Sequence, residues 1–141
     1  MTDNWQFWAL LSALFAALTA ITAKVGVSEI NSNFATFLRT GVVFLASGLF
    51  AWSLGDIEPL SRISPKGAGF LVLSGMMTGA SWVCYFRALQ IGKASQVAPV
   101  DKLSVVFVAI LAALVLGEEL SPLGWVGVGL ISTGAVLMAI A

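Results

Sequence analysis

The stretch from Trp5 to Ala23 reads WQFWALLSALFAALTAITA and contains no charged side chain. A run of about 20 mostly apolar residues is long enough to cross the hydrocarbon core of a bilayer as an α-helix. The residues that precede it, Met1–Asn4, lack the positive charge with which a secretory signal peptide opens. We therefore expect an uncleaved membrane-spanning helix over residues 5–25.

Four further apolar runs follow the first one. They predict helices over residues 33–53, 67–90, 95–116 and 120–140. The runs are continuous, whereas the strands of a membrane β-barrel alternate between apolar and polar residues, so helices are expected throughout. Capping side chains agree with these starts, because Asn31–Asn33, Ser64-Pro65 and Ser121-Pro122 are typical first residues of helices. The sequence predicts an all-α membrane protein with a single domain over residues 1–141.

The composition excludes several other classes of protein. Of the 141 residues, 59% are hydrophobic and 10% are charged, whereas soluble domains have about 45–50% and 25%. A soluble domain this short could not bury so much apolar surface. The 7 basic and 7 acidic residues balance, which gives no attraction to nucleic acid.

No cofactor, metal ion or catalytic group is expected. The chain has no histidine and one cysteine, Cys84, which leaves no zinc site, no intrachain disulfide and no Cys–His pair. Serine and threonine are plentiful, but no histidine base or carboxylate pair accompanies them. The sequence therefore predicts that this protein is not an enzyme.

Charged residues inside the apolar runs are the first candidates for function. Arg39, Asp101 and Lys102 each lie about 9 Å from the start of a predicted helix, and a charge inside hydrocarbon costs about 2.5–3.5 kcal/mol. Together with Lys24 and Arg87 they predict a vestibule that attracts an anionic or zwitterionic solute. The alternative is an internal ion pair of Asp101 with Arg39 or Arg87, with the lysines, Lys24 among them, extending to lipid headgroups.

Aromatic residues and a proline extend this candidate pathway. Trp82 and Tyr85 lie inside the third predicted helix and suit a wall or gate in contact with a solute, or else simply fill the core. Pro99 removes a backbone donor close to Asp101, a combination that transporters use at solute sites, unless it sits harmlessly in a first turn. The predicted substrate pathway therefore consists of Arg39, Trp82, Tyr85, Arg87, Asp101 and Lys102, with a helix break at Pro99.

The Lys and Arg residues leave the membrane orientation open. The N-terminus and the loop 56–66 share one side of the predicted topology. That side holds two basic residues, Arg62 and Lys66, and the opposite side holds five: Lys24, Arg39, Arg87, Lys93 and Lys102. A five-to-two bias would place the C-terminus in the cytoplasm. If Arg39, Arg87 and Lys102 lie inside the bundle, the count is two against two, and insertion in both orientations is possible.

The stretch Ser81–Gly92, SWVCYFRALQIG, resembles the W-x-x-Y-x-x-A-L-x-x-G signature of the EamA domain in the drug/metabolite transporter superfamily. Downstream, Ala94–Pro99 and Leu116–Glu118 fall where that domain has A-x-x-V-x-P and L-G-E, and Gly127 and Gly134 match its closing glycines. The resemblance covers essentially the whole chain, in one five-helix repeat. Typical members have ten helices, in two such repeats of opposite orientation.

The resemblance implies a transporter of the cell (inner or plasma) membrane that moves a small metabolite by alternating access. Its partners would be the lipid bilayer, an amino-acid-like or other polar or amphiphilic solute, and a second copy of the chain. One repeat per chain implies a dimer of half-size subunits, and an antiparallel homodimer is possible. The alternative is a non-transporting membrane protein, or one subunit of a heterodimer. Related small multidrug resistance proteins carry an essential acid in their first helix, which is uncharged here, so Asp101 is the remaining candidate for proton coupling.

Overall fold

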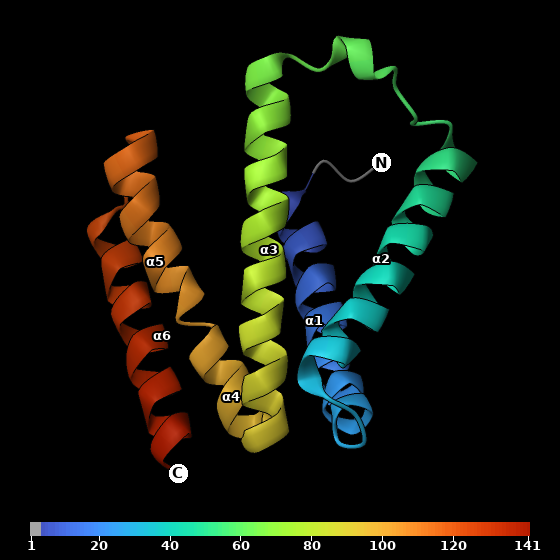
Figure 1. Cartoon of the computed structure of the whole chain (residues 1–141). Coiled ribbons are helices and arrows are strands. Elements are labelled where there is room, and N and C mark those ends of the chain that lie inside the picture. The colour runs from blue at the N-terminus through green and yellow to red at the C-terminus, as the bar shows by residue number, and fades with distance from the viewer. Residues whose placement is uncertain (1–3) are drawn as a thin grey trace. The chain divides into compact units, whose positions relative to one another are not determined.

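The computed structural model describes residues 4–141 (Figure 1); the expectations about Met1–Asp3 lie outside them. Its helical elements are α1 (Trp5–Val27), α2 (Ser32–Leu54), the 3₁₀ turn η1 (Leu60–Arg62), α3 (Pro65–Ile91), α4 (Ala94–Asp101), α5 (Ser104–Leu111), the π-helical η2 (Ala112–Leu116) and α6 (Pro122–Ile140). Five segments are long and apolar enough to cross a membrane, with α4, α5 and η2 forming one of them, Ala94–Leu116. The described residues contain no strand. The prediction of an all-α protein with five membrane-spanning helices is confirmed.

Side-chain caps start three of the helices, as the sequence predicts. In each case an oxygen of the capping residue accepts a hydrogen bond from a backbone N–H of the first turn, which has no partner within the helix. The pairs are Asn31 Oδ1 with Asn33 N at 2.9 Å, Ser64 Oγ with Gly67 N at 3.0 Å, and Ser121 Oγ with Gly124 N at 3.1 Å. Pro65 and Pro122 occupy the first helical positions, where a missing N–H costs no bond.

A left-handed glycine ends α2. Gly55 has φ 73° and donates to Trp52 O at 3.1 Å, and the next residue, Asp56, donates to Ala51 O at 3.0 Å. These two bonds satisfy carbonyls that the helix leaves without a donor, and only glycine adopts this backbone without strain. Gly117, with φ 69°, ends η2 in the same conformation. Both spans therefore end where the sequence places a glycine.

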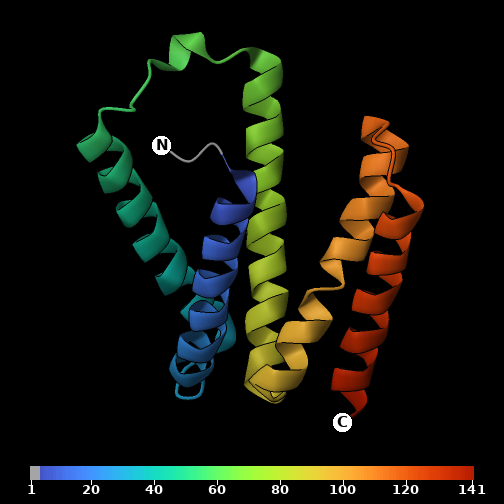
Figure 2. The same ribbon diagram turned by 180° about the vertical axis from the view of Figure 1, so that it is seen from behind.

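The chain divides into two compact units, and α1 runs from one into the other. One unit is Ala23–Gln90, and the other combines the segment up to Thr22 with Ile91–Ala141. In the Ala23–Gln90 unit, α2 and α3 approach each other near the α1–α2 turn and diverge toward η1 (Figures 1 and 2). The core of this unit lies at the end where α2 and α3 approach each other. Val27 and Leu89 are 1% and 0% exposed there.

In the second unit, α4 and α5 both pack against α6. The buried side chains of α5, η2 and α6 are all alanines, namely Ala109, Ala112 and Ala135. Small residues let helix backbones approach closely, which is the usual basis of helix association in membranes. One polar contact adds to this packing, from Gln96 Nε2 to Ala139 O at 3.5 Å.

The fourth span is interrupted just after Pro99. Pro99 lies inside α4, which ends at Asp101, and α5 begins at Ser104. Between them Lys102 and Leu103 have ψ −7° and −16°, and tight i→i+3 bonds replace regular helical ones, for example from Leu103 N to Val100 O at 3.0 Å. The sequence predicts one helix over 95–116, whereas the structure has two helices and a π-helical end. A proline removes the bond to the carbonyl four residues earlier, here Ser95 O, and weakens the turn around it.

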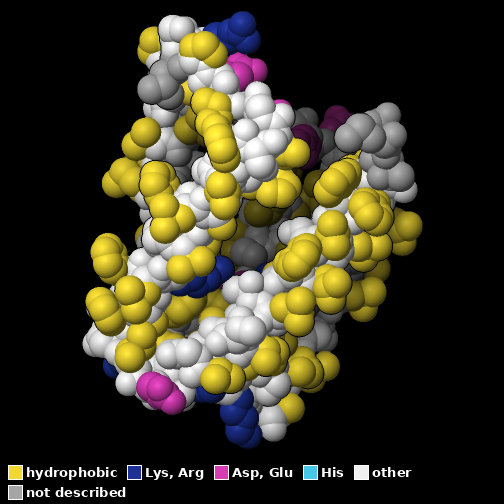
Figure 3. All heavy atoms as spheres, turned by 90° about the vertical axis from the view of Figure 1, so that its right-hand side faces the viewer, with side chains coloured by type: hydrophobic (Ala, Val, Ile, Leu, Met, Phe, Trp, Pro, Cys, Tyr) yellow, Lys and Arg dark blue, Asp and Glu magenta, His cyan; other side chains and the backbone are white. Residues whose placement is uncertain are grey.

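Hydrophobic side chains are spread over the whole length of the face drawn in Figure 3. Large apolar residues are exposed on each spanning helix, including Trp5 (72%), Phe44 (75%) and Leu123 (79%). Exposure of this much apolar surface to water is unfavourable, so lipid chains or another protein subunit are expected to cover it.

Candidate functional site

Arg39 is the charged residue that lies furthest inside α2. It is the eighth residue of that helix, about 10 Å from its start at 1.5 Å per residue, and it is half-buried. Its guanidinium carbon Cζ lies 4.2 Å from the centre of the Trp82 ring and 5.4 Å from that of Phe86, both on α3. Within Ala23–Gln90 the ion pair is Arg62–Glu58, at 3.9 Å between exposed side chains, so aromatic rings rather than a carboxylate contact the Arg39 charge.

This arrangement leaves the guanidinium able to bind a ligand. An aromatic ring contacts a guanidinium without supplying the carboxylate oxygens that its five N–H donors would bind. The cation–π attraction offsets part of the cost of removing the charge from water. Arg39 thus contacts two aromatic rings, and its N–H groups suit a carboxylate or another planar anion.

Tyr85 and Arg87 follow Trp82 on α3, but they have different surroundings. Tyr85 is half-buried, one turn after Trp82, whereas Arg87 is exposed. Arg87 Nη1 donates to Gln90 Oε1 at 2.9 Å, and Gln90 Nε2 donates to Ile30 O at 3.1 Å. Gln90 therefore connects Arg87 to the turn between α1 and α2.

Lys24 has a structural role that the sequence does not reveal. Its Nζ donates to the Leu89 carbonyl at 2.5 Å, near the end of α3. A lysine is well suited to this position, because the last carbonyls of a helix lack intrahelical donors and carry negative partial charge. The interpretation of Lys24 as a lysine extending to headgroups is therefore wrong, and the residue joins the end of α1 to the end of α3.

The remaining predicted site residues, Pro99, Asp101 and Lys102, belong to the other unit. Asp101 Oδ2 lies 3.4 Å from Lys102 Nζ, with side chains 36% and 57% exposed. Within its own unit, Asp101 therefore pairs with its neighbour in the chain. An ion pair of Asp101 with Arg39 or Arg87 would join the two units, and it stays a prediction. Of the predicted residues, the structure thus brings Arg39 to Trp82 and Asp101 to Lys102.

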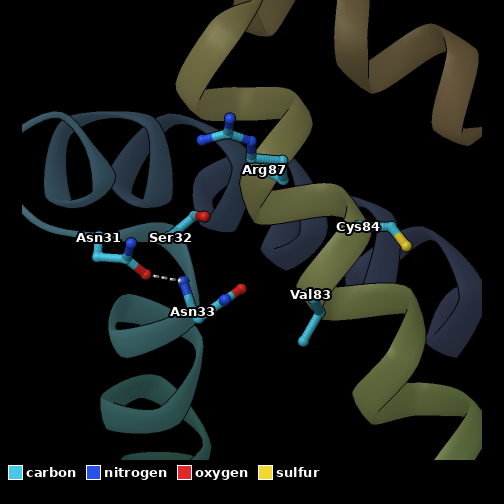
Figure 4. A pocket seen from close by; sticks show the side chains of 6 residues that line it. All are labelled: Asn31, Ser32, Asn33, Val83, Cys84 and Arg87. Carbon is cyan, nitrogen blue, oxygen red and sulfur yellow. Dashed lines mark hydrogen bonds between the residues drawn. The ribbon is translucent and has the colours of Figure 1, made fainter.

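An open pocket of about 470 Å³ lies between the start of α2 and the last turns of α3. It is lined by Asn31, Ser32, Asn33, Val83, Cys84 and Arg87 (Figure 4). Sequence reasoning identified Asn31–Asn33 only as helix caps. No spacing in the sequence places the α2 start beside Arg87, because this proximity arises from the packing of α3 against the α1–α2 turn.

The comparisons with known proteins agree with this architecture. Residues 3–140 match the model of the EamA-like transporter family. Among curated proteins, the chain is 53% identical over 140 residues to a Sinorhizobium sp protein named "Uncharacterized transporter in cobO 3'region", with 99% of each chain covered. No solved structure matches the chain. This multi-pass membrane protein therefore belongs to the EamA-like transporter family.

Proposed function

We propose that the protein carries a small polar or amphiphilic metabolite with a carboxylate, such as an amino-acid-like solute, across the cell membrane by alternating access. The observation that supports this most directly is the contact between Arg39 and Trp82, at 4.2 Å inside two membrane helices. An arginine is costly in this position unless its N–H groups have partners or water. A passing carboxylate would be such a partner.

Each residue of the proposed pathway has a distinct part. Arg39 binds the carboxylate, and Trp82 and Tyr85 contact the apolar portion of the solute or close over it. Arg87 attracts the anionic end from the surface. Asp101 and Lys102 contribute to charge selection, and Asp101 accepts a proton if transport is coupled to protons.

The break in the fourth span supports a mechanism with moving helices. Residues 102–103 connect α4 and α5 through tight i→i+3 bonds rather than regular helical turns. Irregular backbone at membrane depth is tolerated where protein or a water-lined cavity satisfies its polar groups, and transporters place solutes at such breaks. We infer that α4 and α5 change their mutual angle when access alternates.

The working unit in this proposal is a homodimer of two five-helix chains. One family domain per chain, over residues 3–140, supports it, as does the apolar surface that the helices expose. An antiparallel pair would reproduce the two opposed repeats of larger relatives.

Flux into proteoliposomes that contain only this protein tests the proposal. We expect uptake of at least one carboxylate-bearing solute from a broad panel of amino acids and metabolites. Arg39→Gln should lower this flux by roughly ten- to a hundredfold, because the loss of one charge-assisted hydrogen bond corresponds to a change of this size. Arg39→Lys keeps the charge and should recover part of the flux.

Arg62→Lys is the control, because Arg62 is exposed in the η1 turn and pairs only with Glu58 within its unit, and because lysine keeps the positive charge that bears on orientation. It should leave flux unchanged. Absence of flux for the whole panel, with helical content intact, would contradict transport by this chain alone. It would favour the second candidate, a subunit that needs a different partner chain.

A further inference from the structure

The pocket between α2 and α3 is lined by a buried serine, Ser32, whose hydroxyl has no protein partner among the residues that the structure describes. Ser32 is 3% exposed, and among residues 4–141 its Oγ makes no hydrogen bond; the bond at this residue is from Thr36 Oγ1 to the Ser32 carbonyl, at 2.8 Å. In the described part of the chain, every side-chain N or O atom without a hydrogen-bond partner has some accessible surface. The Ser32 hydroxyl therefore faces the pocket that the residue lines.

Further hydrogen-bond donors belong to the same turn of α2 and to α3. Ser32 and Phe34 belong to the first turn of α2, where backbone N–H groups have no helical acceptor. In Figure 4 the side chains of Ser32 and Asn33 point from α2 toward α3, on which Arg87 stands. Arg87 uses one N–H on Gln90 and keeps others for a ligand.

The electrostatics of the pocket favour an anion. None of the residues that line it carries a carboxylate, and its one charged lining residue is Arg87. The start of α2, a helix of 23 residues, adds the positive end of the helix dipole. The bond from Gln90 Nε2 to Ile30 O at 3.1 Å orients the arginine beside this turn.

We propose that this pocket binds a phosphate group, held by Arg87, the Ser32 hydroxyl and the first turn of α2. Phosphate suits the pocket better than a carboxylate, because its oxygens accept bonds from several directions, and the donors come from two helices. Its place at a helix start fits either the headgroup of a phospholipid or a free phosphate in solution. This site goes beyond the proposed function, since it needs no transported solute.

Protection of a thiol in the pocket tests the proposal. Val83→Cys, combined with Cys84→Ala, places a single cysteine on the lining. The full chain is purified in phosphate-free maltoside micelles, and the rate of alkylation by N-ethylmaleimide is measured. One arm adds phosphatidylglycerol, with diacylglycerol as the phosphate-free control lipid. The other arm adds inorganic phosphate, with sodium chloride at equal ionic strength as its control.

We expect phosphatidylglycerol or inorganic phosphate to slow alkylation where its control does not. Arg87→Gln should weaken this protection by about tenfold in ligand concentration, and Ser32→Ala, which keeps the arginine, by less. Lys66→Gln, at the other end of α3, should leave it unchanged. Helical content measured by circular dichroism identifies any variant that fails to fold.

The two arms also separate the sources of the phosphate. Protection by the lipid alone assigns the pocket to a headgroup, and protection by inorganic phosphate assigns it to a free ligand. Protection by neither would overturn the proposal, as would equal protection in the parent, Arg87→Gln and Ser32→Ala proteins. The measurement requires no flux, so it stands apart from the transport experiment.

Discussion

Arg39 lies inside a membrane helix and contacts aromatic rings. Its guanidinium lies 4.2 Å from the Trp82 ring centre and 5.4 Å from that of Phe86, and Phe86 is 3% exposed. Aromatic rings attract a cation without neutralising it. A buried carboxylate would have neutralised the arginine in a closed pair, whereas the aromatic contact leaves its charge unneutralised.

At the residue scale, we expect Arg39 and Trp82 to be energetically coupled. Trp82→Leu should lower the free energy of unfolding more in the parent protein than in an Arg39→Gln background, by about 0.5–2 kcal/mol. Denaturation in mixed detergent micelles, followed for the four proteins of the cycle, measures this difference. Trp52→Leu is the control, since Trp52 lies on α2 near its end and is 70% exposed. Strictly additive effects of the two substitutions would show that the ring contact contributes nothing.

The elements of the fold could be predicted because membrane helices carry a strong local signal. Continuous apolar runs give the five spans, and serine before proline gives the starts of α3 and α6. The break after Asp101 could be suspected from Pro99, but its position two residues later could not be derived, and no sequence feature announces the π-helical turn Ala112–Leu116. Both depend on which hydrogen bonds the backbone adopts instead of the regular ones.

The candidate site was less predictable, because side-chain partners are set by packing between helices. The sequence identifies Arg39 and Trp82 as unusual, yet their contact depends on the rotation of α2 against α3. The bond from Lys24 to the Leu89 carbonyl and the pocket at Ser32 are both absent from the sequence expectations for the same reason.

At the element scale, Pro99→Ala tests the interrupted span. Alanine restores an N–H that can donate to Ser95 O, so we expect a more regular helix and an unfolding free energy higher by about 1 kcal/mol. If bending between α4 and α5 accompanies transport, flux should fall several-fold at the same time. Thermal denaturation and proteoliposome flux measure the two effects. Pro122→Ala should change neither, because Pro122 occupies the first turn of α6, where no bond is lost. Full flux in a stabilised Pro99→Ala protein would argue against a moving break.

At the scale of the whole molecule, the basic residues bear on how two chains pair. Arg39 is half-buried against aromatic rings and Lys24 donates to a helix-end carbonyl, so neither is free to act as an ordinary surface charge. Lys93 and Lys66 are loop residues on opposite sides of the predicted topology. The number of basic residues that determine orientation is then nearly the same on the two sides. We expect insertion both ways and an antiparallel dimer.

Labelling of cysteines from each side of the membrane measures this orientation. In a Cys84→Ala background, Ile91→Cys and Ser61→Cys should each react about half from either side, because these two exposed positions are uncharged and their substitution leaves the positive charge close to balanced. Glu118→Lys with Glu119→Lys adds positive charge to the turn before α6 and should fix one orientation, whereas Arg62→Gln with Lys66→Gln should favour the other.

Each of these two biased proteins alone should lose flux, and co-expression of the two should restore it, since only the mixture contains antiparallel pairs. Full flux from one biased protein would show that the pair is parallel, and a single orientation in the parent protein would favour a different partner chain.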